Sequence, residues 1–160
     1  MPKKASRDFE LFIVDAFVAI HKIEIYTISF KDGNELQGSS LHWDATMRAF
    51  EIIGESLNNL LENESFESSA PSYFRKIVNF RNVIAHGYFG ISADEVWDII
   101  AYKLHDLNND LFVVTTSTFN IEETLLLTID EYSTFQEENI TKYLHELYNK
   151  IKNKPLERAL

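Results

Sequence analysis

The stretch SRDFELFIVDAFVAIHKIEIYT, residues 6–27, carries apolar side chains at intervals of three and four residues, which is the spacing of one face of an α-helix. Further apolar residues widen this stripe beyond a single face: Leu11, Val14, Phe17, Val18 and Ile25. A helix that is apolar around most of its circumference is buried, either at the centre of a bundle or against a second subunit. We therefore expect residues 6–27 to form a central helix.

The rest of the chain also favours helices. Gly and Pro number only 5 and 3 among 160 residues, which argues against a loop-rich β-sandwich or barrel. Apolar stripes predict helices over about residues 41–63, 73–86, 91–111, 121–132 and 136–153, with loops at 29–40 and 62–72. The β-branched run at 112–120 predicts a helix boundary. We expect an all-α fold: an up-and-down antiparallel bundle over residues 6–111 and extra helices over 112–160.

Several residues mark the expected ends and contacts of these helices. Ser72 is expected to cap the third helix, and Gly87 stands where that helix should stop. Ser92 and Glu95 have the spacing of a capping box at the start of the fourth helix. Gly54 lies inside the second helix, where Gly costs about 1 kcal/mol relative to Ala. A close helix crossing or a bound ligand would explain that position.

Composition limits the possible functions. The absence of Cys excludes disulfides, thiolate metal sites and a Cys nucleophile. A net charge of −10 argues against a protein that grips nucleic acid through many phosphates, so any RNA contact needs a local cationic site. Neither a signal peptide nor an apolar run long enough to cross a bilayer is present, and we expect a cytoplasmic protein without membrane association. No phosphate loop or complete metal motif occurs, and we expect no metal and no cofactor.

The stretch RNVIAHGYFG, residues 81–90, has two interpretations. In the first, it is a helix terminus: Gly87 ends the helix, His86 faces the negative end of the helix dipole, and Tyr88 packs against Val83 as a hydrophobic cap. In the second, it is a reaction centre. Arg81 supplies a permanent forked positive charge for a phosphate, and His86 gives and takes protons near neutral pH. The spacing alone leaves both interpretations open.

The second interpretation requires two copies of the chain. Cleavage of RNA through its own 2′-hydroxyl needs a base for that hydroxyl and an acid for the leaving oxygen, whereas the motif offers one His per chain. A two-fold dimer that pairs the third helices would bring both copies of Arg81 and His86 into one groove. Arg75 and Lys76, earlier on the same helix, would extend the positive patch.

Three segments together resemble one known family. RNVIAHGYFGI resembles the R-x4-H-x-Y signature of HEPN-domain toxins of the HepT type, FEIIGESLNNL is similar to the second helix of that family, and AIHKIEIYTISF is similar to its first helix and following loop. The resemblance spans about residues 8–111. It implies a dimeric helical bundle with a metal-independent endoribonuclease site in the dimer groove. It also implies that Arg81 and His86 are the catalytic pair and that Asn82 orients the site.

The resemblance further implies a partner and a modification. Tyr88 matches the family tyrosine to which an antitoxin, a minimal nucleotidyltransferase (MNT), adds AMP from ATP; the bulky anionic group would repel RNA. Glu55 matches an acidic position of the second helix, where it either holds Arg81 or is a buried structural carboxylate. The chain departs from the family in length, because the segment from Phe112 onward has no counterpart. The alternative function is a HEPN dimer that no longer cuts RNA and serves as the binding partner of a nucleotidyltransferase.

Overall fold

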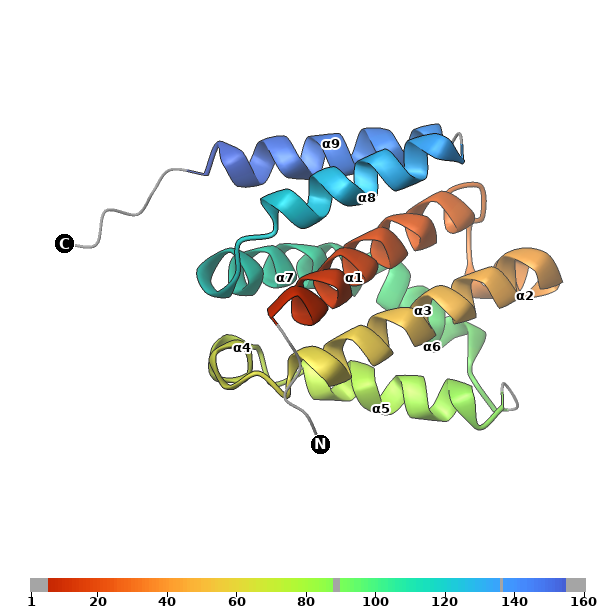
Figure 1. The fold of residues 1–160 in the computed structure, drawn as a ribbon. Coiled ribbons are helices and arrows are strands. Elements are labelled where there is room, and N and C mark those ends of the chain that lie inside the picture. The colour runs from red at the N-terminus through yellow and green to blue at the C-terminus, as the bar shows by residue number, and fades with distance from the viewer. Residues whose placement is uncertain (1–5, 88–89, 136, 155–160) are drawn as a thin grey trace.

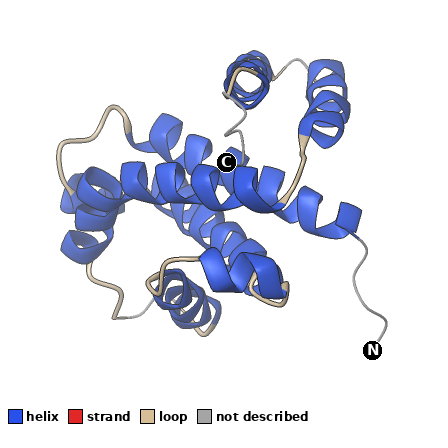
Figure 2. Cartoon of the chain, turned by 90° about the vertical axis from the view of Figure 1, so that its left-hand side faces the viewer, coloured by secondary structure: helices blue, strands red, loops and turns tan. Residues whose placement is uncertain are grey.

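The computed structural model describes residues 6–87, 90–135 and 137–154, with the side chains of residues 6 and 7 excepted. Within these ranges the regular elements are all helical and no strand occurs (Figure 2), which confirms the expected all-α class. The elements are α1 (Ser6–Thr27), α2 (Gly33–Gly38), α3 (Ser40–Leu60), α4 (Glu64–Ser69), α5 (Phe74–Ala85), α6 (Ala93–Asp98), the π-helix η1 (Ile99–Lys103), α7 (Leu104–Thr118), α8 (Glu122–Thr134) and α9 (Glu138–Lys152).

Helix α1 is the centre of the bundle, as its broad apolar surface predicts. It packs along α3 and also contacts α7, α8 and α9, and Ile13, Phe17 and Ile23 on it are fully buried. Helices α8 and α9 lie together along one edge of the molecule, and α5 lies along the opposite edge (Figure 1). The central position of α1 therefore leaves α5 at the periphery, packed on α3.

Two segments expected to be loops contain short helices, so those two predictions were wrong. In α2 the side chain of Asp32 accepts a hydrogen bond from the Glu35 N–H at 2.8 Å, and Leu36 is fully buried. In α4 the side chain of Asn63 accepts from the Phe66 N–H at 3.0 Å, and Phe66 is fully buried. Each helix has six residues, fewer than two turns, and anchors a single apolar side chain, so it is too short to produce a periodic stripe.

Two predicted helix ends also differ from the structure. Helix α7 continues through the β-branched run to Thr118, because the Thr118 hydroxyl donates to the Val114 carbonyl at 2.7 Å and the Thr115 side chain is buried in the core. Tertiary burial thus overrides the weak helix propensity of this run. Ser72 does not cap the third helix: α5 begins at Phe74, its N-cap residue is Tyr73, and no side chain caps it.

One of the two hydrogen bonds of the expected capping box is confirmed. The Ser92 hydroxyl accepts from the Glu95 N–H at 3.3 Å at the start of α6.

The C-terminal pair α8 and α9 is tied to α1 by polar and ring contacts. The Thr124 hydroxyl donates to Glu10 at 2.7 Å, and the Tyr143 ring stacks on the His21 ring at 4.1 Å.

Candidate active site

The site begins with a close crossing of α3 and α5 at Gly54. A Cβ atom at this position would lie 2.2 Å from the Arg81 Cβ and 3.3 Å from the Ile77 carbonyl oxygen. Only a residue without a side chain allows the two helices to approach this closely. The close helix crossing expected from the sequence is confirmed, and the position of Gly54 needs no ligand to explain it.

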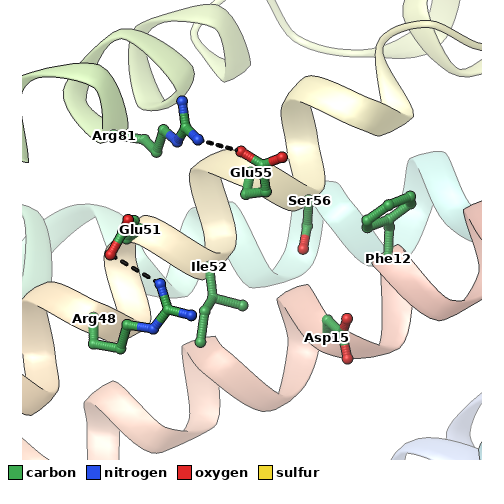
Figure 3. A pocket seen from close by; sticks show the side chains of 8 residues that line it. All are labelled: Phe12, Asp15, Arg48, Glu51, Ile52, Glu55, Ser56 and Arg81. Atoms are coloured by element: carbon green, nitrogen blue, oxygen red, sulfur yellow. Dashed lines mark hydrogen bonds and ion pairs between the residues drawn. The ribbon is translucent and has the colours of Figure 1, made fainter. Parts of the chain in front are cut away.

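Arg81 leaves this crossing with its guanidinium held on two sides. Its Nη2 atom lies 2.6 Å from the Glu55 Oε2 atom on α3 (Figure 3). Its Nη1 atom donates to the Asn82 amide oxygen at 3.0 Å. The Arg81 side chain is 31% exposed and the Glu55 side chain 47% exposed. Glu55 is therefore a partly exposed partner of Arg81 and not a buried structural carboxylate. The Arg81 Nε atom is buried without a hydrogen-bond partner among the described residues.

Arg81 and Glu55 lie at the wall of a cavity of about 330 Å³ between α1, α3 and α5 (Figure 3). A second ion pair stands on the same face of α3, where the Arg48 Nη1 atom is 3.0 Å from a Glu51 carboxylate oxygen. Asp15 of α1 also faces the cavity, and burial, followed by the nearby Glu131, raises the pKa of its carboxyl despite an opposing effect of Lys22. The residues that line the cavity are Phe12, Asp15, Arg48, Glu51, Ile52, Glu55, Ser56 and Arg81.

The sequence interpretation missed most of this cavity. Arg48, Ile52 and Glu55 recur at intervals of four and three residues, so the side chains share one face of α3. That spacing was the feature of the sequence that could have indicated a shared polar surface on α3. The apolar stripe of α3 dominates its pattern, and nothing in the sequence shows which polar residues of α3 face α1.

His86 lies at the C-terminal end of α5. It is the C-cap residue, and its N–H donates to the Asn82 carbonyl at 3.2 Å. Gly87 follows with φ of +124°, a conformation that side chains disfavour, and its N–H donates to the Ile84 carbonyl at 3.1 Å. The prediction that Gly87 ends this helix is confirmed. Tyr88, with its expected contact to Val83 and its expected modification, lies outside the described residues.

One chain brings only part of the predicted site together. Glu55, Arg81 and Asn82 are in contact, whereas the His86 side chain is exposed and bonds to none of the described residues. His86 follows Arg81 by five positions, so at about 100° per residue the directions of their side chains differ by about 140°. Arg75 is paired with Glu67 of α4 at 2.7 Å. Within one chain the Arg81 and His86 side chains therefore leave α5 in different directions.

Two further findings concern the described part of the chain. No group of three or more His, Asp or Glu side chains there is placed to hold a metal ion. No helix there combines the length and the hydropathy that crossing a lipid bilayer requires.

Comparisons with known proteins agree with the motif. The family model described as "Ribonuclease HepT-like" matches residues 18–113. The protein named "Putative RNase MJ1380" from Methanocaldococcus jannaschii is 27% identical over 111 residues, which cover 69% of this chain and 99% of that protein. "Putative RNase MJ0127" from the same organism is 30% identical over 105 residues, covering 65% and 82% of the two chains. No solved structure matches the chain. The chain belongs to the HepT-like ribonuclease family of HEPN-type helical domains.

Proposed function

We propose that this protein is a metal-independent endoribonuclease whose active site is a groove between two copies of the chain. The observation that carries the proposal is the guanidinium of Arg81, fixed by Glu55 and Asn82 on a helix that ends in the exposed His86. Membership of a ribonuclease family supports it. In this proposal Arg81 and His86 are catalytic, and Glu55 and Asn82 position Arg81.

The reaction that these groups suit is transfer of the phosphoryl group to the neighbouring 2′-oxygen. One His86 accepts the proton of the 2′-hydroxyl while the 2′-oxygen bonds to phosphorus. The bond from phosphorus to the 5′-oxygen breaks, and the His86 of the second copy donates a proton to that leaving oxygen. The products are a 2′,3′-cyclic phosphate and a 5′-hydroxyl. Arg81 stabilises the negative charge that develops on the phosphate oxygens, and its remaining N–H groups are available for this.

The position of α5 supports a dimer through this helix. It lies at one edge of the molecule, away from the C-terminal pair α8 and α9 (Figure 1). Its outward residues include Asn82 and His86, together with Val83, which is 53% exposed although apolar. A second α5 packed on this face would cover Val83 and bring two copies of His86 together.

We propose that the two parts of the chain expected from the sequence have different roles. Residues 6–111 form the HEPN-like catalytic unit, and residues 112–160 form a helical extension that begins as the C-terminal part of α7. The extension packs on α1, where it leaves the α5 edge uncovered. This arrangement fits a stabilising role for the extension better than a direct role in RNA cleavage.

We also propose that the protein is the toxin of a toxin–antitoxin pair. The antitoxin is an MNT nucleotidyltransferase that transfers AMP from ATP to the Tyr88 hydroxyl, with release of pyrophosphate. Tyr88 follows His86 by two residues in the sequence, so an added phosphate there would place negative charge beside the proposed RNA groove. Intact mass after co-expression with an MNT protein should show added AMP on the native chain and none on Tyr88→Phe. An undiminished adduct on Tyr88→Phe would eliminate this assignment.

One observation favours a second candidate, a HEPN subunit that binds a nucleotidyltransferase without cutting RNA. The charge of Arg81 is already balanced by Glu55, which weakens its attraction for phosphate. Activity separates the two candidates, because a binding subunit leaves RNA intact.

The deciding experiment incubates the purified protein with total RNA or tRNA in the presence of EDTA. Cleavage is expected, and it should be lost in Arg81→Ala and in His86→Ala. His105→Ala is the matched control, because His105 is also an exposed helical histidine but lies on α7. Wild-type rates in both Arg81→Ala and His86→Ala would reject the assigned site, and intact RNA with every protein would favour the binding subunit.

A further inference from the structure

A second cavity, of about 370 Å³, lies between α5 and the segment formed by η1 and α7. It shares no lining residue with the Arg81 cavity. Its walls are mainly apolar and include Ile77, Phe80 and Ile99. The Phe80 ring is held edge-on against the Phe50 ring, with ring centroids 5.6 Å apart. The cavity therefore offers a fixed aromatic and aliphatic lining of a size suited to a small planar group.

Two lysines with no charged partner line this cavity. Lys76 of α5 and Lys103 of η1 form no ion pair with any residue that the structure describes. By contrast, Arg48, Arg75 and Arg81 are each paired with a carboxylate. Two ammonium groups against the single carboxylate of Asp106 give this cavity a net positive lining in a chain of net charge −10, which favours an anion.

The backbone around this cavity is also unusual. The Leu104 N–H donates to the Ile99 carbonyl, which is the five-residue hydrogen bond of a π-helix. Single π turns inside α-helices are rare and recur at functional sites. Here the wide turn places Ile99, Lys103 and Leu104 along the same cavity. An apolar wall and one of the two lysines thus come from one irregular turn.

We propose that this cavity is a nucleobase subsite for single-stranded RNA, a proposal that rests on the ribonuclease function above. An unpaired base enters against Phe80 and Ile99, while Lys76 and Lys103 hold the phosphates on either side of it. Unpaired bases can be turned out of a single strand, and any base can stack on an aromatic ring. Lys76 precedes Arg81 by five residues, which is about 7.5 Å along the helix axis and about 140° around it, so an RNA strand that reaches both must cross α5.

The cavity also indicates which bases it accepts. Asp106 of α7 lines it, and a carboxylate accepts hydrogen bonds but donates none. Adenine, cytosine and guanine carry an exocyclic amino group that donates to such an acceptor. Uracil donates at this edge only through its N3–H, which stands between two carbonyl oxygens that a carboxylate repels. The hydroxyl of Tyr73 at the same cavity is already committed to Asp110, to which it donates at 2.6 Å. The subsite should therefore prefer adenine to uracil.

Fluorescence anisotropy with labelled oligoadenylate and oligouridylate tests the proposal, with His86→Ala as background so that the RNA stays intact. Oligoadenylate should bind more tightly, and Asp106→Asn should reduce the preference. In the Lys76→Gln, Lys103→Gln double variant the slope of log affinity against log salt should fall by about 1.4, since each single-strand phosphate contact contributes about 0.7. Ile99→Trp, which fills the cavity, should weaken binding at least about fivefold. Lys31→Gln, at an exposed lysine outside the cavity, is the matched control.

The outcomes separate this proposal from the ribonuclease proposal. Cleavage that depends on Arg81 and His86, together with unchanged RNA affinity in the cavity variants, would overturn the subsite and leave the ribonuclease standing. Weakened affinity in the cavity variants of a protein that never cuts RNA would support the subsite and overturn the ribonuclease. If the cavity variants bind RNA as tightly as the wild type but no longer bind the MNT protein, the subsite is overturned and the cavity belongs to that partner. Should Ile99→Trp fail to melt cooperatively, Ile77→Trp fills the same cavity from α5.

Discussion

The substitution Gly54→Ala tests the helix crossing that positions Arg81. The new methyl group would lie 2.2 Å from the Arg81 Cβ and 2.8 Å from its Cγ, so α3 and α5 must separate. Overpacking of this kind costs about 1–3 kcal/mol, and the higher helix propensity of Ala returns up to about 1 kcal/mol. A contact of 2.2 Å between two Cβ atoms belongs at the upper end of the overpacking cost, so we expect a net loss of about 2 kcal/mol in the free energy of unfolding. For a chain of this size the melting temperature should fall by about 4–8 °C.

The assay is thermal and urea unfolding followed by circular dichroism, with Gly38→Ala as the matched control. Gly38 is also helical, and a Cβ atom there would have nothing within 4 Å. Ala at that position should be neutral or stabilising by up to about 1 kcal/mol. A Gly54→Ala protein that melts at or above the wild-type temperature would show that the helices do not cross as closely as described.

Three further predictions concern the polar groups near the two cavities. Glu55→Gln should change the free energy of unfolding by less than about 1 kcal/mol, because its ion pair with Arg81 is partly exposed. The variant should still lower kcat/KM for RNA cleavage, because Arg81 is released from its position. A kcat/KM equal to that of the wild type would show that Glu55 does not position Arg81. Asp15→Asn should raise the melting temperature at pH 7. Burial raises the pKa of the Asp15 carboxyl, so its protonated form stabilises the fold below the ordinary pKa near 4, and this contribution is lost as the pH rises. The gain in melting temperature from Asp15→Asn should therefore vanish in melts at about pH 3.5. Tyr73→Phe should cost about 1–2 kcal/mol in urea unfolding at pH 7, because a hydroxyl-to-carboxylate hydrogen bond to Asp110 is lost. Burial and that bond raise the pKa of Tyr73, so the wild type should lose stability above about pH 10 and the variant should lose less.

The main helices and the crossing at the site could be predicted from the sequence. The stripe of α1 indicated a helix buried on most sides, and its contacts with α3, α7, α8 and α9 account for that burial. Gly54 inside a helix indicated a close approach, which proved to be to Arg81. Gly87 indicated a helix end and has the positive φ that such an end requires. A helix that is apolar on most sides, a Gly inside a helix and a Gly at its end each have few physical explanations, so each could be interpreted from the sequence alone.

What the sequence did not predict depends on tertiary contacts. The capped turns α2 and α4 are held by one buried side chain each, Leu36 and Phe66, and six residues cannot show a helical period. The π turn of η1 lies between α6 and α7, and its residue types do not distinguish it from an ordinary α-helical turn. The cavity beside Arg81 depends on which polar residues of α3 face α1, which the apolar pattern does not encode.

The central claim is that one reaction uses groups from two copies of the chain. The most direct measurement is the RNA cleavage rate, in EDTA, of a mixed dimer purified through two different affinity tags. One copy is wild type and the other carries His86→Ala. Because one His86 acts as base and the other as acid, the mixed dimer should be as inactive as the dimer in which both copies carry His86→Ala. A mixed dimer that retains half of the wild-type rate, or a wild-type chain that cuts RNA as a monomer, would contradict the account.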